Sequence, residues 1–427
     1  MPRFDWRARR WLPCARQAAP FVVAALLLAL GYGWHAAGVA HQANYQDYGF
    51  QNLNYSDIIW LYLRDSGAQH HRPYLDYPLE YPPLTGGLAY LLGFAPALRA
   101  YFALTYGVLA AGALLAIAAL GRLPGAQRWY LAAAPALLLY TGLNWDLAAV
   151  ALTALALVAY QRGHDRWGTL ALVTAVWLKL FPIVFLAAIL LERVRARRIR
   201  AAVEIGALFA LGSAAINVPL ALVNVRYWGR FFTANSGRRP EPSLWTLLPR
   251  LTTPQVNAAS LALLAAGAVL IAALALRSRG AVTLPAGALL LLWWLFSNKV
   301  YSPQYALWVF LALALLRPTW VYWRAFVLFD LAYYYASFQV LYMNRFDNAV
   351  LTGWELRHLI APLVVVRLVL LGGFVAWGAV CLARQGIPLA WPARQLRRWH
   401  SPVQTGAPPF APVAPAHALT EPLPDAD

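Results

Sequence analysis

The sequence predicts an all-α protein that crosses a membrane many times. Of its 427 residues, 61% are hydrophobic and only 12% are charged, and the mean hydropathy is +0.52. Apolar segments of roughly 20 residues, the length that spans a hydrocarbon core as a helix, recur along most of the chain. Because an open sheet edge leaves polar backbone groups unpaired in lipid, every crossing must be helical. We expect about twelve transmembrane helices and a large first extracytoplasmic loop.

The charge pattern indicates membrane topology rather than nucleic-acid binding. The chain has 35 lysines and arginines against 17 aspartates and glutamates, a net charge of +18. The arginines cluster at the ends of apolar segments, where basic residues keep a loop on the cytoplasmic side. Only Lys179 and Lys299 are lysines, and the two cysteines, Cys14 and Cys381, match no metal or redox spacing.

The first apolar segment sets the orientation of the others. Residues 1–20 are basic and are expected to stay in the cytoplasm, so a span at about 21–38 runs outward. A cleaved signal peptide is the alternative, but no small-residue cleavage site follows convincingly, and the later spans require the same parity. Residues 39–97 then form an extracytoplasmic loop. Within it, Leu84 to Ala95 is apolar but too short to cross, which predicts a re-entrant or interfacial helix.

The remaining apolar segments divide into two predicted modules, 21–224 and 225–399. Residues 167–192 form either one kinked helix or two short helices that meet at Lys179. The second module begins with an outer loop, 225–255, and the tail 400–427 is expected to be a disordered cytoplasmic segment. Further spans are predicted near residues 98–120, 129–143, 146–160, 202–223, 256–276, 282–297, 303–316, 319–341 and 359–383.

Polar residues gather at the extracytoplasmic ends in this topology. The first loop contains Asp47, Asp57, Asp65, Asp76 and Glu80 in a chain with few acids, although any single one of them could serve only to keep the loop solvated. Acids and cations on one face suit a sugar phosphate, whose transfer develops positive charge at the anomeric carbon while phosphate departs. One carboxylate would remove the acceptor's proton, and cations would bind the phosphate.

Two charged residues fall near the middle of predicted spans. Asp330 and Arg367 would each cost several kcal/mol if they were unpaired in the membrane. We therefore expect an ion pair between them, with a proton relay as the alternative.

Four segments resemble a known family when they are taken in order. They are Tyr55-Ser56-Asp57-Ile58, Glu80-Tyr81-Pro82-Pro83-Leu84, Lys179-Leu180-Phe181-Pro182 and Asn298-Lys299-Val300-Tyr301-Ser302-Pro303-Gln304-Tyr305. Together they resemble the GT-C superfamily of polyprenol-phosphate-sugar-dependent glycosyltransferases. The chain is most similar to the bacterial mannosyltransferases of glycosyltransferase family 87, and it also resembles the enzyme that adds the first mannose of the GPI anchor.

The resemblance implies an inverting transfer, usually without a metal, and a catalytic acid in the first loop that maps onto Asp57. The sequence departs from the GPI-anchor enzymes, which have an Asp-x-Asp there, because Ser56-Asp57-Ile58-Ile59 contains a single acid. Asp47, Asp76 and Glu80 are the alternative bases. No metal and no cofactor are expected.

The predicted site extends beyond the base. Four side chains are expected to bind the donor phosphate, namely Lys179, Lys299, Arg345 and His358. Others are expected to contact the substrates, namely Glu80, Tyr81, Asn144, Asp146, Asn298, Tyr301, Gln304, Tyr305, Arg238 and Arg239. The loop arginines Arg226, Arg230, Arg238 and Arg239 oppose the positive-inside trend, so they are expected either to bind an anionic acceptor or headgroup or to attract anionic lipid unspecifically.

The expected function is that of a multi-pass plasma-membrane enzyme of a bacterium with its active site outside. It would transfer a hexose from a polyprenyl-phosphate donor to a lipid or glycan acceptor, and mannose is the leading candidate for that hexose. Its partners would be these substrates and membrane lipids, and not nucleic acid. A secondary transporter or lipid flippase is the alternative, because broken helices and embedded charges also occur there, and a scaffold without activity is a third.

Overall fold

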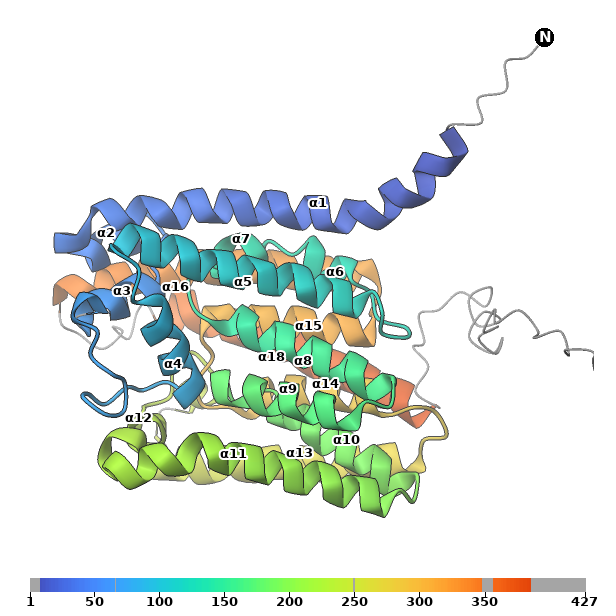
Figure 1. Cartoon of the computed structure of the whole chain (residues 1–427). Helices are drawn as coiled ribbons and strands as arrows, with labels where there is room; N and C mark the ends of the chain where they lie inside the picture. Colours follow the sequence, from blue (N-terminus) through green and yellow to red (C-terminus); the bar gives the residue numbers. More distant parts are fainter. Residues whose placement is uncertain (1–7, 66, 249, 348–355, 385–427) are drawn as a thin grey trace, which may run out of the picture. The chain divides into compact units, whose positions relative to one another are not determined.

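The computed structural model is helical throughout the residues that it describes, which are 8–65, 67–248, 250–347 and 356–384 (Figure 1). The side chains of 8–16, 68, 343–347 and 356–357 are not described, so Cys14 and the predicted tail 400–427 lie outside the description. Within the described residues there is no β-strand, only an isolated bridge between Pro73 and Tyr77. The described helices belong to one compact unit, Met1–Leu389.

Five of the described helices are long and apolar enough to cross a membrane. This confirms an all-α membrane architecture but not the count of twelve crossings. The first candidate span, Gln17–Ala40, includes most of α1 (Ala8–Ala36). The other four contain α5 (Leu98–Leu120), α11 (Ile199–Trp228), α13 (Thr253–Arg277) and α18 (Ala361–Ala383). Helix α5 has the predicted bounds, because its apolar length alone decides where it begins and ends.

Shorter helices fill the space between these five. Four of the shorter ones are apolar over 10–17 residues, namely α4 (Pro83–Leu92), α8 (Asp146–Gln161), α14 (Thr283–Ser297) and the segment Pro303–Leu316, which includes α15 (Ala306–Leu316). The others considered below are α9 (Asp165–Leu178), α10 (Ile183–Arg195) and α16 (Trp320–Asp347). Helix α4 lies where the first-loop helix was predicted.

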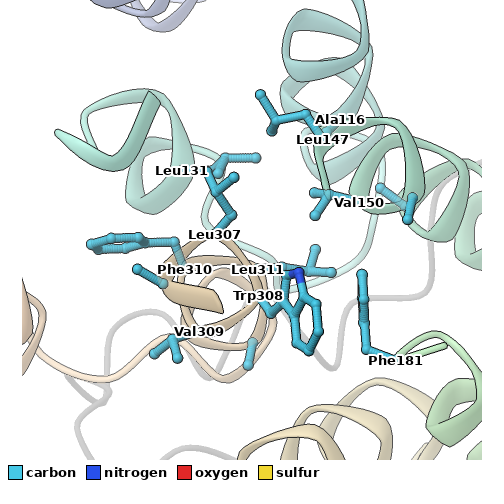
Figure 2. Packing of buried hydrophobic residues seen from close by; sticks show 14 of the residues in the cluster. Ala116, Leu131, Leu147, Val150, Phe181, Leu307, Trp308, Val309, Phe310 and Leu311 are labelled. Carbon is cyan, nitrogen blue, oxygen red and sulfur yellow. The ribbon is translucent and has the colours of Figure 1, made fainter. Parts of the chain in front are cut away.

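Helix α15 lies in the core, and every one of its side chains is buried. It packs against α8, α14 and the short α6 (Trp129–Ala132). Figure 2 shows Trp308 of α15 beside Phe181, and their rings are stacked with centroids 4.5 Å apart. Elsewhere small residues allow close approach: a Cβ on Gly112 of α5 would lie 3.3 Å from the Leu147 carbonyl oxygen of α8.

The structure departs from one sequence-based expectation about helix continuity and decides between two alternatives for another segment. The predicted span 129–143 is broken into α6 and α7 (Ala136–Tyr140), because Pro135 lacks an N–H and its ring clashes with the carbonyl one turn earlier. The segment 167–192 forms two helices, α9 and α10, separated at Lys179. There the backbone is extended (φ −156°, ψ 132°), and Pro182 precedes the second helix.

The loop helices lie at one end of the long helices. Figure 1 shows α2 (Tyr45–Gln51), α3 (Asp57–Arg64), α4 and α12 (Arg230–Gly237) together at that end. Backbone contacts join segments far apart in the sequence: the Asp57 amide donates to the Leu143 carbonyl (2.8 Å), and the Glu241 amide donates to the Lys299 carbonyl (3.0 Å). These contacts bring the predicted site segments together.

Candidate active site

A cavity of about 620 Å³ opens among the loop segments, and we call it the Asp57 cavity. Its walls come from α3, the segment 80–82, the break at 179–181, α12 and the turn 298–305. Five basic side chains line it against two carboxylates, those of Asp57 and Glu80. Aromatic rings supply much of the remaining wall. The cavity therefore combines positive charge with flat apolar surfaces.

Helix α3 places Asp57 in this cavity. Ser56 caps the helix, since its hydroxyl oxygen accepts a hydrogen bond from the Ile59 amide (3.4 Å) and its hydroxyl donates to the Gly142 carbonyl. The opposite face of the helix is buried in the core. Side chains three or four residues apart share a helix face, and the residues of α3 that line the cavity follow this spacing: Asp57, Trp60, Leu61 and Arg64.

Two side chains donate hydrogen bonds to the same carboxylate oxygen of Asp57. The Tyr81 hydroxyl is 3.0 Å from Oδ2, and the Asn144 amide nitrogen is 2.8 Å from it. Asn144 also donates to the Tyr81 hydroxyl (2.9 Å), so the three groups form a closed triangle. The triangle holds the orientation of the Asp57 carboxylate.

Burial raises the pKa of Asp57 above the ordinary aspartate value. The Tyr81 hydroxyl and the charge of Lys179 act in the opposite direction, because they stabilise the carboxylate. A raised pKa makes the carboxylate a stronger base than an exposed one.

Lys179 lies behind this triangle and is paired with a buried acid. Its Nζ is 3.0 Å from Asp146 Oδ2 and donates to Asn144 Oδ1 at 3.1 Å. Asp146 is fully buried and accepts a hydrogen bond from the Trp308 indole (2.7 Å). Asp146 neutralises the charge that was predicted to bind the donor phosphate. Lys179 lines the cavity, but its contacts assign it to the support of Asn144.

Lys299 is also held by the protein. Its Nζ donates to the Ser236 carbonyl (2.9 Å) and to Asn257 Oδ1 (2.6 Å), which ties the turn after α14 to α12 and α13. Burial and the nearby Arg238 lower the pKa of Lys299. Among the described residues no salt bridge holds Lys299, which places its ammonium group at the cavity wall without a bonded carboxylate.

Several predicted contact residues line the Asp57 cavity, and they are Glu80, Tyr81, Arg238, Asn298, Gln304 and Tyr305. Arg238 is paired with Glu241. The Tyr305 ring stacks on Trp308 with centroids 3.9 Å apart. Asn298 also shapes its own turn, because its side-chain amide donates to the Val300 carbonyl (3.0 Å).

Other predicted contact residues do not line the cavity. Asn144 and Asp146 are buried behind its wall. Tyr301 is 2% exposed, and the Arg367 guanidinium carbon lies over its ring, 3.8 Å from the centroid. Arg239 is exposed outside the cavity, and His358 does not line it either. The side chain of Arg345 lies outside the described part of the structure.

The alternative bases are less suited to the reaction than Asp57. Asp47 and Asp76 do not line the cavity, and the ion pair with Arg72 lowers the pKa of Asp76 to about 2. Although burial opposes it, the pair with Arg64 holds the pKa of Glu80 below its usual range. Glu80 therefore remains an ionised partner of Arg64.

The predicted ion pair between Asp330 and Arg367 does not form among the described residues. Asp330 accepts a hydrogen bond from the Tyr140 hydroxyl (2.8 Å). Arg367 donates to the Pro242 carbonyl (2.7 Å) and stacks over Tyr301. Hydrogen bonds and ring faces thus replace the expected opposite charge.

Sequence reasoning missed several groups that line the cavity, and three of them are Arg64, Trp60 and Trp308. The first two could have been found, because they follow Asp57 by seven and three residues and so share its helix face. Trp308 could not, since it lies 162 residues from its hydrogen-bond partner Asp146. Within the described chain, no group of three or more His, Cys, Asp and Glu side chains is gathered as metal ligands.

Comparison with known proteins adds no family to this description. No protein-family model matches the chain, and no curated protein matches it.

Proposed function

We propose that the chain is an integral membrane glycosyltransferase with Asp57 as its general base. The observation that carries this proposal is the Asp57 carboxylate, held by Tyr81 and Asn144 in a cavity whose charged lining is mainly basic. The donor would be a hexose linked to a polyprenyl phosphate, and mannose is the leading candidate for that hexose. The acceptor would be a hydroxyl of a lipid or glycan.

The proposed reaction is a single displacement at the anomeric carbon. Asp57 accepts the proton of the acceptor hydroxyl while that oxygen forms its bond to the carbon. The bond between the anomeric carbon and the phosphate oxygen breaks, and the phosphate leaves with the bonding electrons. Because the attack and departure occur on opposite faces, the configuration inverts. The phosphate departs already ionised, so no general acid is needed.

The lining of the cavity supports binding of such a donor. Lys299 is a basic side chain at its wall without a carboxylate bonded to it in the described chain, and charge-assisted hydrogen bonds from it would stabilise the departing phosphate. The rings of Tyr305 and Trp308 offer flat surfaces to a sugar or a prenyl chain.

The proposal includes a GT-C-like arrangement in a bacterial plasma membrane with the Asp57 cavity facing outward. The five long apolar helices support part of the expected twelve crossings, and the shorter apolar helices would supply further ones. The arginine pattern supports the orientation.

The test is transfer by purified protein in lipid nanodiscs that contain polyprenyl-phosphate-mannose and a membrane lipid extract. We expect formation of a mannosylated product, and Asp57→Asn should lower its rate by about 10²–10⁴-fold, the usual contribution of a positioned base. Asp76→Asn is the matched control, because Asp76 is outside the cavity, and it should retain near-normal transfer.

Two results would oppose the proposal. Near-normal transfer by a well-folded Asp57→Asn protein would remove Asp57 from the chemistry. Movement of the donor across the bilayer without any transfer product would favour the transporter or flippase.

A further inference from the structure

A second cavity, of about 840 Å³, adjoins the first, and we call it the arginine cavity. Three arginines line it, Arg64, Arg226 and Arg230, together with the carboxylates of Asp65 and Glu80. Arg64, Glu80 and Arg230 line both cavities. The proposed transfer reaction uses the Asp57 cavity and leaves the arginine cavity without a role.

The charges of the arginine cavity are unevenly paired. Arg64 bonds to both carboxylates, with its Nη1 2.5 Å from Glu80 Oε1 and its Nε 2.5 Å from Asp65 Oδ1. Within the described chain, Arg226 and Arg230 form no ion pair, and both are exposed. Two guanidinium groups are therefore available to an anionic ligand.

A kink in α11 directs Arg226 toward this cavity. Asn224 has non-helical backbone angles (φ −152°, ψ 86°), and its Oδ1 accepts a hydrogen bond from the Tyr227 amide at 3.1 Å. This side-chain bond starts a new turn at the end of the helix. Gly229 then follows, and Arg230 begins α12. Both arginines therefore follow the kink, Arg226 near the end of α11 and Arg230 at the start of α12.

Apolar side chains beside the bend indicate what kind of molecule carries the anion. Leu222, Val223 and Val225 are 82%, 70% and 66% exposed. They lie at the end of the candidate membrane span Ile199–Trp228, and only 11% of the residues in the most apolar part of that span are buried. Hydrocarbon chains would cover these side chains in a bilayer. The guanidinium groups would then lie at the level of the lipid headgroups.

We propose that the arginine cavity binds the phosphate group of an anionic phospholipid, with its acyl chains along the end of α11. The guanidinium forks of Arg226 and Arg230 donate paired hydrogen bonds to the tetrahedral phosphate oxygens. The Arg64–Glu80 pair forms the wall toward the Asp57 cavity. This proposal does not depend on glycosyl transfer.

Binding is measured with the full chain purified in an uncharged detergent and titrated calorimetrically with dioctanoyl phosphatidylglycerol. Arg226→Gln and Arg230→Gln should each weaken binding about tenfold or more, the usual effect of losing a charge-assisted contact. Arg226→Lys should fall between wild type and glutamine, since it keeps the charge without the fork. Arg239→Gln is the matched control, because Arg239 is an exposed arginine just after α12 that lines neither cavity, and it should bind as wild type.

Two further ligands test whether the cavity needs both the phosphate group and the acyl chains of a phospholipid. Glycerol phosphate has the phosphate without the chains, and oleate has a chain and a charge without the phosphate, so both should bind at least tenfold more weakly. Equal binding of either one would overturn the proposal, as would equal loss in Arg239→Gln or no loss in Arg226→Gln and Arg230→Gln. Each of these results leaves the Asp57-dependent reaction standing, because none of the readouts measures transfer.

Discussion

At the scale of single residues, the site is a chain of partners that ends on one carboxylate. Trp308 bonds to Asp146, Asp146 pairs with Lys179, and Lys179 bonds to Asn144, which donates to Asp57. Each member satisfies a group that would otherwise be buried without a partner. This series of contacts explains why Lys179, which was predicted to bind phosphate, lies against the buried Asp146.

Removing the Lys179 side chain should lower the stability of the protein more than its affinity for the donor. Lys179→Met leaves the fully buried Asp146 uncompensated, which typically costs about 3–5 kcal/mol. Adding Asp146→Asn to that variant should recover much of the loss, because the buried charge is then gone. Unfolding in detergent measures both effects. If Lys179→Met is as stable as wild type but has lost donor affinity, Lys179 binds the donor phosphate after all.

Asp57 should reduce stability at neutral pH, although it supports the proposed activity. Because burial raises its folded pKa, its contribution to stability is fully present below the unfolded-state pKa and is lost as pH rises through the folded value. Asp57→Asn should therefore be at least as stable as wild type at pH 7, and the difference should vanish near pH 3. Thermal unfolding across that range checks the sign, and a variant less stable at pH 7 would contradict it.

The raised pKa of Asp57 also determines the pH at which transfer activity declines on the acidic side, the acidic limb of the pH profile. Transfer should decline as pH falls through the folded pKa of Asp57, at a higher pH than an ordinary carboxylate with a pKa near 4 would cause. The pH dependence of kcat/KM measures this limb. A limb at or below the ordinary value would show that Asp57 titrates as an exposed acid.

At the scale of elements, the site depends on where helices begin and end. Helix α3 begins at Asp57 and α8 begins at Asp146, while α9 ends just before Lys179. A residue at a helix end can turn toward a cavity, whereas the side chains of α15 that follow Trp308 are buried in the core. Interrupted helices therefore supply the polar groups.

Loss of the Ser56 cap should lower both stability and activity. Ser56→Ala removes the acceptor for the Ile59 amide and the donor for the buried Gly142 carbonyl, so it should cost about 1–2 kcal/mol and shift the start of α3. Thr252→Ala is the control, because Thr252 caps α13 outside the cavity. It should reduce stability to a similar or smaller degree and leave transfer unchanged. Equal transfer by both variants would separate the cap from the site.

At the scale of the whole molecule, the outer loops have to lie on one side of the membrane for the site to form. The first loop, α12 and the turn 298–305 all line the Asp57 cavity. Segments that share a cavity lie on the same side, whichever side that is. The arginine distribution predicts the outside.

Cysteine labelling would determine that side. Gln69 and Ser236 are both exposed, so cysteines introduced there should react with a membrane-impermeant maleimide added to intact cells. A cysteine introduced at Arg197, in the basic segment predicted to be cytoplasmic, should react only after the cells are opened. Protection of positions 69 and 236 together would reverse the predicted orientation.

The sequence by itself determined the helical membrane class, the bounds of α5 and the break at Lys179. It could do so because apolar length, proline and charge act locally, within one or two helical turns. It also selected Asp57, Glu80 and Tyr81 as members of one site, through a resemblance among short segments that the structure places around one cavity.

Only the tertiary structure decided the partners. Asp146 pairs with Lys179 because α8 packs beside α9. Asp330 of α16 accepts a hydrogen bond from Tyr140 rather than pairing with Arg367, although α16 also packs against α18, the helix of Arg367. The structure also places Tyr301 under Arg367 rather than at the cavity wall, and nothing near Tyr301 in the sequence shows that Arg367 covers its ring. Such pairings depend on which helix faces meet, and a local pattern determines the face of each helix but not the neighbour that it meets.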